Sequence, residues 1–458
     1  MTIPQIPLDF NSIIPEIILT SLASLLLLLG LLRINRSVLV WSAVVLILSL
    51  IPTIPIFEGK AFGEFFLNDS LAVYIKIILL LGTILSLLLL SSSLSKGYIL
   101  IKESIALVVF ASTGMMLLVS CRELISFFVS LELMSLSLYA LVAIRKYDIR
   151  ANEAAIKYFM LGGLSTVITL FGIALIYGAT KSTDFIHIIK AVNTSSELLI
   201  GGLSLFIVGF CFKIALVPFH MWAPDVYEGA PTSVTAFIST VPKVAILGAF
   251  ARILIEIFPA YHLQWSSFLI LFSILSMAIG NILALSQKNI KRMLAYSGIA
   301  HGGYVILGLV AGTQAGLNAV VTYMLVYTFM NIGAFAVVIA LKEESIENYK
   351  GIHKYHPLIA FVMLIFMFSL TGVPPTAGFI VKFNVFLQAI KAGLVWLVII
   401  AVLFTVVSAY YYLRVVMFMY MKEPLKRPAA SLSRDVEIVL ALCAIGSTIL
   451  GILPLFLI

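Results

Sequence analysis

Long runs of apolar residues, separated by short polar segments, recur throughout the 458-residue sequence. A run of about 20 apolar residues spans the hydrocarbon core of a bilayer as a helix, because an open backbone cannot satisfy its hydrogen bonds in lipid. The composition agrees, since 62% of the residues are hydrophobic and 11% are charged, against about 25% charged in soluble proteins. We therefore predict an all-α polytopic membrane protein, and exclude a soluble enzyme, a disordered regulator and a fibrous protein.

The apolar runs divide into about fourteen predicted transmembrane spans. No alternation typical of strands appears, and the longest polar stretches are loops too short to fold as domains. The predicted spans lie at 13–32, 38–57, 71–93, 103–121, 124–143, 155–179, 199–222, 230–257, 266–286, 292–312, 316–341, 357–390, 393–420 and 436–457.

Lysine and arginine are distributed unevenly between alternate loops, and an excess of them marks the cytoplasmic side. If the N-terminus lies outside, eighteen face inward and six face outward, so we expect both termini on the outer side. The formal net charge of +8 then reflects topology, and nucleic-acid binding is not expected. The inward set is Arg33, Arg36, Lys96, Lys102, Arg145, Lys146, Arg150, Lys157, Lys288, Lys291, Arg292, Lys342, Lys350, Lys354, Lys422, Lys426, Arg427 and Arg434, and the outward set is Lys60, Arg122, Lys181, Lys190, Arg252 and Lys391.

Ionisable side chains inside the spans carry most of the functional information, because a charge at mid-bilayer costs roughly 2.5–3.5 kcal/mol on insertion scales. Any one lysine could snorkel or form a structural pair, and a central histidine could be an ordinary hydrogen-bonded core residue. Three lysines and one glutamate on separate helices favour a hydrated ion path. The residues concerned are Glu132, Lys213, Lys243, His301 and Lys382.

Other charged residues lie nearer the span ends. Lys76 and Arg414 are expected to snorkel to the interface. For Lys157 and Glu103, near inner span ends, the sequence leaves open a gate or an ordinary cap.

Two predicted spans are interrupted by proline, which removes a backbone donor and clashes with the preceding turn. Pro218 and Pro224 interrupt the seventh span, and the Pro374–Pro375 pair interrupts the twelfth. Broken helices in corresponding positions indicate an ion path and an inverted repeat.

The spacing of the charged residues fits such a repeat, since Glu132 to Lys213 and His301 to Lys382 are both 81 positions apart. We predict two inverted five-helix repeats, spans 4–8 and 9–13, each with one broken helix. The predicted segments are a three-helix segment at 1–102, the two repeats at 103–260 and 261–421, and a last helix at 422–458.

Cofactor motifs are absent from the sequence. Cys121, Cys211 and Cys443 form no CxxC pair, and neither GxGxxG nor a P-loop occurs. We expect no iron–sulfur cluster, metal or nucleotide in this chain.

Several motifs closely resemble the antiporter-like subunits of proton-pumping NADH:quinone oxidoreductase, respiratory complex I. Mrp-type cation/proton antiporters and membrane-bound hydrogenases share the same core. Within the group the chain resembles the N-type subunit in length and span number, and it lacks the long lateral helix of the L-type and the glutamate of the M-type at Lys382. The motifs are LELMSLSLYAL (131–141), FKIALVPFHMWAPDVYEGAPTSV (212–234), the Pro242–Lys243 pair, ALSQKNIKRMLAYSGIAHGGY (284–304) and TGVPPTAGFIVKF (371–383).

The resemblance implies a role for each buried charge. Glu132 matches the fifth-span glutamate, Lys213 the seventh-span lysine, Lys243 the eighth-span connecting lysine and Lys382 the twelfth-span terminal residue. His301 falls at a tenth-span histidine of many relatives. The resemblance also implies a translocase subunit in the cell inner membrane, with no cofactor of its own and with other membrane subunits of the complex and lipid as partners.

The expected mechanism is a proton wire through the middle of the membrane, from Lys213 by way of Lys243 and His301 to Lys382. At about 7 Å and an effective dielectric constant of about 20, the Glu132–Lys213 attraction is roughly 2.4 kcal/mol. Moving one charge against about 100 mV costs ~2.3 kcal/mol. The energy of separating this pair is therefore of the size needed to drive the transfer of one proton. The alternatives are an Mrp-type sodium/proton antiporter or hydrogenase subunit, a membrane anchor whose charges only join helices, and an unrelated solute transporter.

Overall fold

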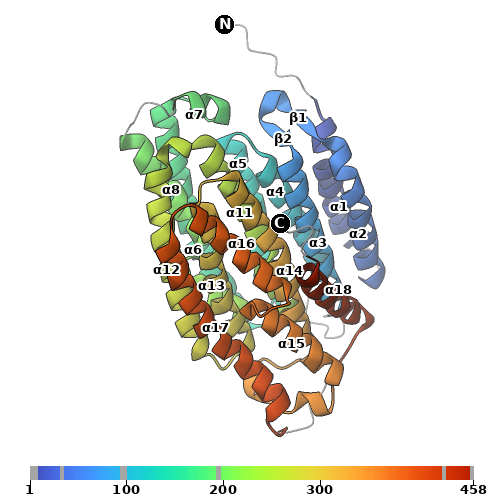
Figure 1. Cartoon of the computed structure of the whole chain (residues 1–458). Coiled ribbons are helices and arrows are strands. Elements are labelled where there is room, and N and C mark those ends of the chain that lie inside the picture. The colour runs from blue at the N-terminus through green and yellow to red at the C-terminus, as the bar shows by residue number, and fades with distance from the viewer. Residues whose placement is uncertain (1–8, 31–35, 93–100, 192–196, 425–429, 454–458) are drawn as a thin grey trace.

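The computed structural model describes residues 9–30, 36–92, 101–191, 197–424 and 430–453. Four of the inward-facing basic residues predicted above, Arg33, Lys96, Lys426 and Arg427, lie outside these ranges. The described chain is a bundle of helices with one small hairpin (Figure 1), which confirms the all-α membrane class. The first nine helices are α1 (Ile14–Gly30), α2 (Arg36–Leu50), α3 (Ser70–Ser92), α4 (Ile101–Ser120), α5 (Leu124–Val142), α6 (Ile149–Thr180), α7 (Phe185–Ala191), α8 (Glu197–Lys213) and α9 (Trp222–Gly229).

The second half of the chain continues the bundle. Within the described ranges, twelve helices are long and apolar enough to cross a membrane, and Pro357–Thr371 is a shorter apolar helix. The count of fourteen spans, the inverted repeats and the segment boundaries stay predictions. The remaining helices are α10 (Thr232–Ile238), α11 (Val241–Arg252), α12 (His262–Leu285), α13 (Ile290–Val310), α14 (Gln314–Leu341), α15 (Pro357–Thr371), α16 (Ala377–Lys391), α17 (Val395–Met421) and α18 (Arg434–Ile452).

Polar side chains cap the N-termini of α5 and α13. The side chain of Glu123 accepts a hydrogen bond from the Ser126 amide at the start of α5, and that of Asn289 accepts one from the Lys291 amide at the start of α13. These caps satisfy amides that have no partner within the helix. They fix the entry points of two helices that carry predicted site residues.

The sequence did not predict the hairpin between α2 and α3. Strand β1 (Gly59–Ala61) pairs antiparallel with β2 (Phe66–Asn68), and Gly63 between them has φ 74°, a conformation that glycine adopts without steric cost. The hairpin lies at the same end of the bundle as α7 (Figure 1). Strands of three residues leave too little alternation for a pattern to be read.

Both predicted breaks are present. The seventh span divides into α8, which ends at Lys213, and α9, which begins at Trp222. The twelfth divides into α15 and α16, and Gly372 with φ 88° ends α15 by donating its amide to the carbonyls of Phe368 and Ser369. Lys213 therefore precedes its break and Lys382 follows its own, as the sequence indicates.

A third break, missed in the sequence, separates α10 from α11. Thr240 leaves helical geometry, with φ −124° and ψ −70°, and Pro242 enters the first turn of α11. Proline is favoured there because its missing amide would have no helical partner. The Pro242–Lys243 pair thus marks a helix start rather than a continuous span.

The core is built around α13, in which every residue except Arg292 is buried inside the protein. It packs against α9, α12, α14 and α16. Only about a third of α6, α17 and α18 is buried, so these helices form outer faces of the bundle. Helix α13 is apolar apart from a few side chains, one of which is His301.

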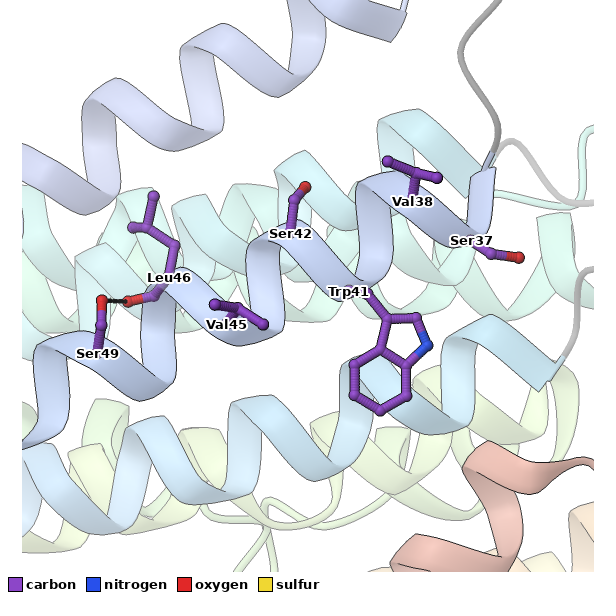
Figure 2. Close-up of a pocket in the computed structure, with 7 residues that line it drawn as sticks. All are labelled: Ser37, Val38, Trp41, Ser42, Val45, Leu46 and Ser49. Atoms are coloured by element: carbon purple, nitrogen blue, oxygen red, sulfur yellow. Dashed lines mark hydrogen bonds between the residues drawn. The ribbon is translucent and has the colours of Figure 1, made fainter.

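The outer face of α2 carries a shallow apolar groove (Figure 2). The hydroxyls of Ser42 and Ser49 in it donate to carbonyls of their own helix, at 2.9 and 2.7 Å. The residues that line the groove include no titratable group. The groove is lined by Ser37, Val38, Trp41, Ser42, Val45, Leu46 and Ser49.

Candidate functional site: a row of buried lysines and a histidine

The structure pairs Glu132 of α5 with Lys213 at the end of α8. Lys213 Nζ lies 3.5 Å from Glu132 Oε1 and donates to Ser135 Oγ at 2.8 Å and to the Tyr139 hydroxyl at 3.3 Å. Thr166 of α6 donates to the same Glu132 oxygen at 2.8 Å. The lysine side chain is 4% exposed and the glutamate 20%. The two groups predicted to form a switch are therefore in contact.

Lys243 in α11 reaches across to α13. Its Nζ donates to the carbonyl oxygen of Gly298 at 3.2 Å, and the residue is buried. Because this described partner is a carbonyl rather than a carboxylate, Lys243 and Lys213 stand in different electrostatic surroundings.

His301 lies between two tyrosine hydroxyls. Its Nδ1 is 2.6 Å from the hydroxyl of Tyr323 in α14, and its Nε2 is 3.1 Å from that of Tyr412 in α17. The Tyr412 hydroxyl also hydrogen-bonds Ser297 Oγ, one turn before the histidine. An imidazole with both nitrogens in hydrogen bonds can take a proton at one and release a proton from the other.

Lys382 uses the break in the twelfth span. Its Nζ donates to the carbonyls of Leu370 and Thr371, both at 2.9 Å, which are the last two residues of α15. The last carbonyls of a helix lack helical partners and attract a cation. The ammonium also lies 4.8 Å from the centre of the Tyr304 ring.

Polar residues that sequence reasoning missed connect the histidine region with Lys382. The Tyr411 hydroxyl donates to Asn281 Oδ1 at 3.0 Å, and Asn281 Nδ2 donates to the Tyr304 hydroxyl at 3.1 Å. The rings of Tyr411 and Tyr412 are 4.3 Å apart between centroids. Together with Tyr412, these side chains form a tyrosine series that extends from His301 through α17 and α12 to Tyr304. The ring of Tyr304 lies beside the Lys382 ammonium.

The described contacts of Lys213 do not lead to Lys243. Within the described ranges, the ion pair and the hydrogen bonds of the Lys213 ammonium all run to α5, toward Glu132. The structure thus joins Glu132 with Lys213, and His301 with the surroundings of Lys382. A direct step from Lys213 to Lys243 stays a prediction.

A second charged cluster joins α6, α9 and α13, and it contains Lys157. The Lys157 ammonium lies 2.9 Å from Asp225 Oδ2, and Arg292 Nη1 lies 2.7 Å from Asp225 Oδ1 and 3.1 Å from Glu228 Oε2. Burial opposes ionisation of Asp225, but the hydrogen bonds from Lys157 and Arg292 outweigh it and hold its pKa below the usual range. Asp225 therefore fixes α9, the helix that follows the first break, to its neighbours.

The expectation that Lys76 snorkels is wrong, whereas snorkelling of the half-exposed Arg414 stays a prediction. Lys76 Nζ lies 2.6 Å from Glu16 Oε1 in α1 and donates to Asn68 Oδ1 at 2.8 Å, with both charged side chains buried. Arg414 donates to the carbonyls of Leu285 and Gln287 at the end of α12, both at 2.7 Å. For Lys76, partners inside the protein replace the membrane interface.

These features define a class: a polytopic helical membrane protein with broken spans, three buried lysines on separate helices and a buried histidine. Residues 120–408 match the family described as NADH:quinone oxidoreductase/Mrp antiporter, transmembrane. The chain is 65% identical, over 100% of both chains, to NADH-quinone oxidoreductase subunit N 1 of Thermodesulfovibrio yellowstonii. It is 42% identical to subunit N of Trichlorobacter lovleyi, covering 98% of this chain and 95% of the relative.

The chain belongs to this family, among the N subunits of NADH-quinone oxidoreductase, which confirms the resemblance seen in the sequence. A chain of respiratory complex I from Thermus thermophilus has the same fold, with a TM-score of 0.84, 33% identity and coverage of 96% of this chain and 97% of that one. A chain of the Mrp complex from Dietzia has a TM-score of 0.83 at 19% identity, covering 98% of this chain and 95% of that one. This second likeness shows a shared fold alone.

Proposed function

We propose that the buried charges of this subunit carry protons through the middle of the membrane while NADH oxidation and quinone reduction take place in other subunits. The single observation that carries the proposal is the contact of Lys213 with Glu132. Lys243, His301 and Lys382 are buried as well. Charged residues at membrane depth mark ion paths and proton relays.

The Glu132–Lys213 pair acts as the switch. At 3.5 Å and an effective dielectric constant of about 20, their attraction is roughly 4.7 kcal/mol. This exceeds the ~2.3 kcal/mol needed to move one charge against about 100 mV. Separating the pair removes the attraction that holds the ammonium charged, so Lys213 releases a proton, and closing the pair reloads it.

The released proton passes to Lys243 and then to the His301 region. His301 takes it at one ring nitrogen and releases a proton from the other to a tyrosine hydroxyl. Tyr411, Asn281 and Tyr304 are the hydrogen-bonded polar side chains that line the way from there toward Lys382. The carbonyls of Leu370 and Thr371 stabilise Lys382 in its charged form.

The surroundings of Glu132 support a partner subunit. Along α5, Ile125, Val129 and Leu136 are 56%, 60% and 54% exposed, and Glu132 lies on the same stripe. A partly exposed carboxylate in an apolar outward stripe is costly against lipid. A neighbouring membrane subunit of the complex is proposed to cover this face.

The chain itself is proposed to hold no redox centre, metal or other cofactor. The three cysteines are buried, free and dispersed along the chain, which fits a subunit that carries protons and not electrons. The proposed location is the cell inner membrane with both termini on the outer side, as the distribution of lysine and arginine indicates.

A test uses the purified complex in lipid vesicles, driven by NADH and a soluble quinone, with internal acidification followed by a quenched dye. Lys243→Ala should lower the acidification rate at least tenfold while the complex assembles normally, because the path loses its central proton carrier. Lys288→Ala changes an exposed loop lysine and should have no effect. Normal acidification in Lys243→Ala would remove this residue from the path, and sodium-dependent acidification without NADH would favour an antiporter instead.

A further inference from the structure

We propose that Lys291 is a positioning residue, which fixes the turn between α9 and α10 against α13 and thereby keeps Lys243 within reach of the Gly298 carbonyl. The inference deepens the proposed function and rests on it. Lys291 is the second residue of α13 and is 1% exposed. It is therefore a buried cation that the proposed relay does not use.

The Lys291 ammonium binds three oxygen atoms from two other parts of the fold. Its Nζ donates to the carbonyls of Glu228 and Ala230 at 2.7 and 2.8 Å, and it lies 3.2 Å from Glu344 Oε1. Glu228 is in the last turn of α9, and Ala230 directly follows that helix. Glu344 lies in the segment after α14. Because an ammonium has three donors, these acceptors satisfy it.

The position of Lys291 at a helix start is electrostatically unfavourable by itself. A cation near the N-terminus of a helix meets the positive end of the helix dipole, and a buried cation also loses its hydration. The carbonyls at the end of α9 offset both effects, because they lack helical partners and carry negative partial charge. One side chain therefore joins the start of α13 to the end of α9.

Asn289 and Arg292 contact the same region through side chains. Asn289 Nδ2 donates to Glu228 Oε1 at 3.3 Å and to Glu344 Oε2 at 3.4 Å, and Arg292 Nη1 donates to Glu228 Oε2 at 3.1 Å. Lys291 differs from both because two of its acceptors are backbone carbonyls. It therefore fixes the chain itself, whereas the other two contacts hold side chains that can rotate.

The turn that Lys291 holds lies between two proposed proton carriers. The chain from Lys213 to Lys243 contains one break before α9 and another after α10, and Ala230 lies between these two helices. Helix α13 meets this chain again at Gly298, whose carbonyl accepts from Lys243 at 3.2 Å. Gly298 lies about 10 Å further along α13 than Lys291. Two contacts on one helix thus set the position of Lys243.

Arginine distinguishes positioning from proton transfer. Its guanidinium can donate to carbonyls but stays protonated in proteins, so it can replace a positioning lysine and cannot replace a proton carrier. In the vesicle assay Lys291→Arg should retain roughly half or more of the acidification rate, whereas Lys243→Arg should lower the rate at least tenfold. Lys291→Met has no donor and should lower the rate about tenfold, the effect of losing a hydrogen bond to a charged group.

Lys288→Met is the matched control, because Lys288 lies in the same segment and is exposed. It should assemble and acidify vesicles as the unaltered protein does. If Lys291→Met fails to assemble, Lys291→Gln takes its place and should also lower the rate, because the shorter amide side chain does not span to both carbonyls. A rate for Lys291→Arg as low as that for Lys291→Met would overturn the positioning role, and so would a normal rate in the assembled Met or Gln variant.

A high-resolution density map of the whole complex with the Met or Gln variant reads the geometry directly. We expect the distance from Lys243 Nζ to the Gly298 carbonyl oxygen to exceed 3.5 Å in that variant, and to stay near 3.2 Å in Lys288→Met. An unchanged distance in the variant overturns the inference. The map does not depend on proton pumping, so its result is distinguishable from failure of the proposed function, which Lys243→Ala tests.

Discussion

Lys382 Nζ donates to the carbonyl of Thr371, the last residue of α15, at 2.9 Å. The break in the twelfth span thus leaves the carbonyl oxygen of Thr371 free to accept a hydrogen bond from Lys382, eleven residues further along the chain. The relationship explains how a buried ammonium is held here: the helix end supplies oxygen ligands and a negative partial charge.

Replacement of Lys382 tests this arrangement. In Lys382→Met the acidification rate in vesicles should fall at least tenfold, because the terminal proton carrier is lost. Lys391→Met changes an exposed lysine at the end of the same helix and should leave the rate unchanged. Equal rates for both variants would show that the path does not use Lys382.

Tyr412 is expected to position His301. Tyr412→Phe removes the hydroxyl that bonds His301 Nε2 and Ser297, so the acidification rate should fall about tenfold, equivalent to ~1.4 kcal/mol. Tyr410→Phe alters a tyrosine that is 61% exposed and serves as the control. A rate in Tyr412→Phe equal to that of the control would exclude the hydroxyl from the relay.

The buried pair of Glu16 and Lys76 should stabilise the N-terminal helices. Glu16→Gln leaves a buried ammonium without its counter-ion, which costs about 3–5 kcal/mol, so the assembled complex should lose activity at lower temperature. The double variant Glu16→Leu with Lys76→Met should recover most of the stability, because an apolar pair has no charge to compensate. Glu64→Gln, in an exposed pair, should change little. No recovery in the double variant would mean that the pair does more than balance charge.

The ion pairs of Asp225 should stabilise the folded protein by the same amount at every pH near neutrality. Its pKa is lowered in the folded chain, so the stabilisation is complete above the ordinary value of about 3.9 and is lost only as the pH falls through the lowered folded value. The difference in thermal inactivation between the unaltered complex and Asp225→Asn should stay constant from about pH 8 to 5 and shrink below about pH 4. A difference that vanishes near pH 6 would contradict the assignment.

Sequence reasoning predicted the residues whose type is rare at membrane depth. Lys213, Lys243 and Lys382 stand out because a charge within an apolar run is costly, and the prolines mark two of the breaks. The membrane class and the five candidate site positions, these three lysines with Glu132 and His301, therefore follow from local composition. The contact of Lys213 with Glu132 depends on packing across 81 positions, which the spacing only suggested.

The tyrosine series and the Glu16–Lys76 pair escaped prediction for physical reasons. Tyrosine is ordinary in membrane spans, so the partnership of Tyr412 with His301, 111 positions apart, leaves no local signal. Glu16 lies in the first turn of α1, where an acidic residue is expected as a favourable dipole partner. Only the fold brings Lys76 to it.

The central claim is that contact and separation of Glu132 and Lys213 control proton movement. The most direct measurement is the number of protons moved per NADH oxidised by vesicles containing Glu132→Ala or Lys213→Ala, with assembly verified and Glu58→Ala, an exposed position, as control. The account predicts that both variants assemble and that each moves far fewer protons per NADH than the unaltered complex, while Glu58→Ala does not. An unchanged proton count in either fully assembled variant would contradict it.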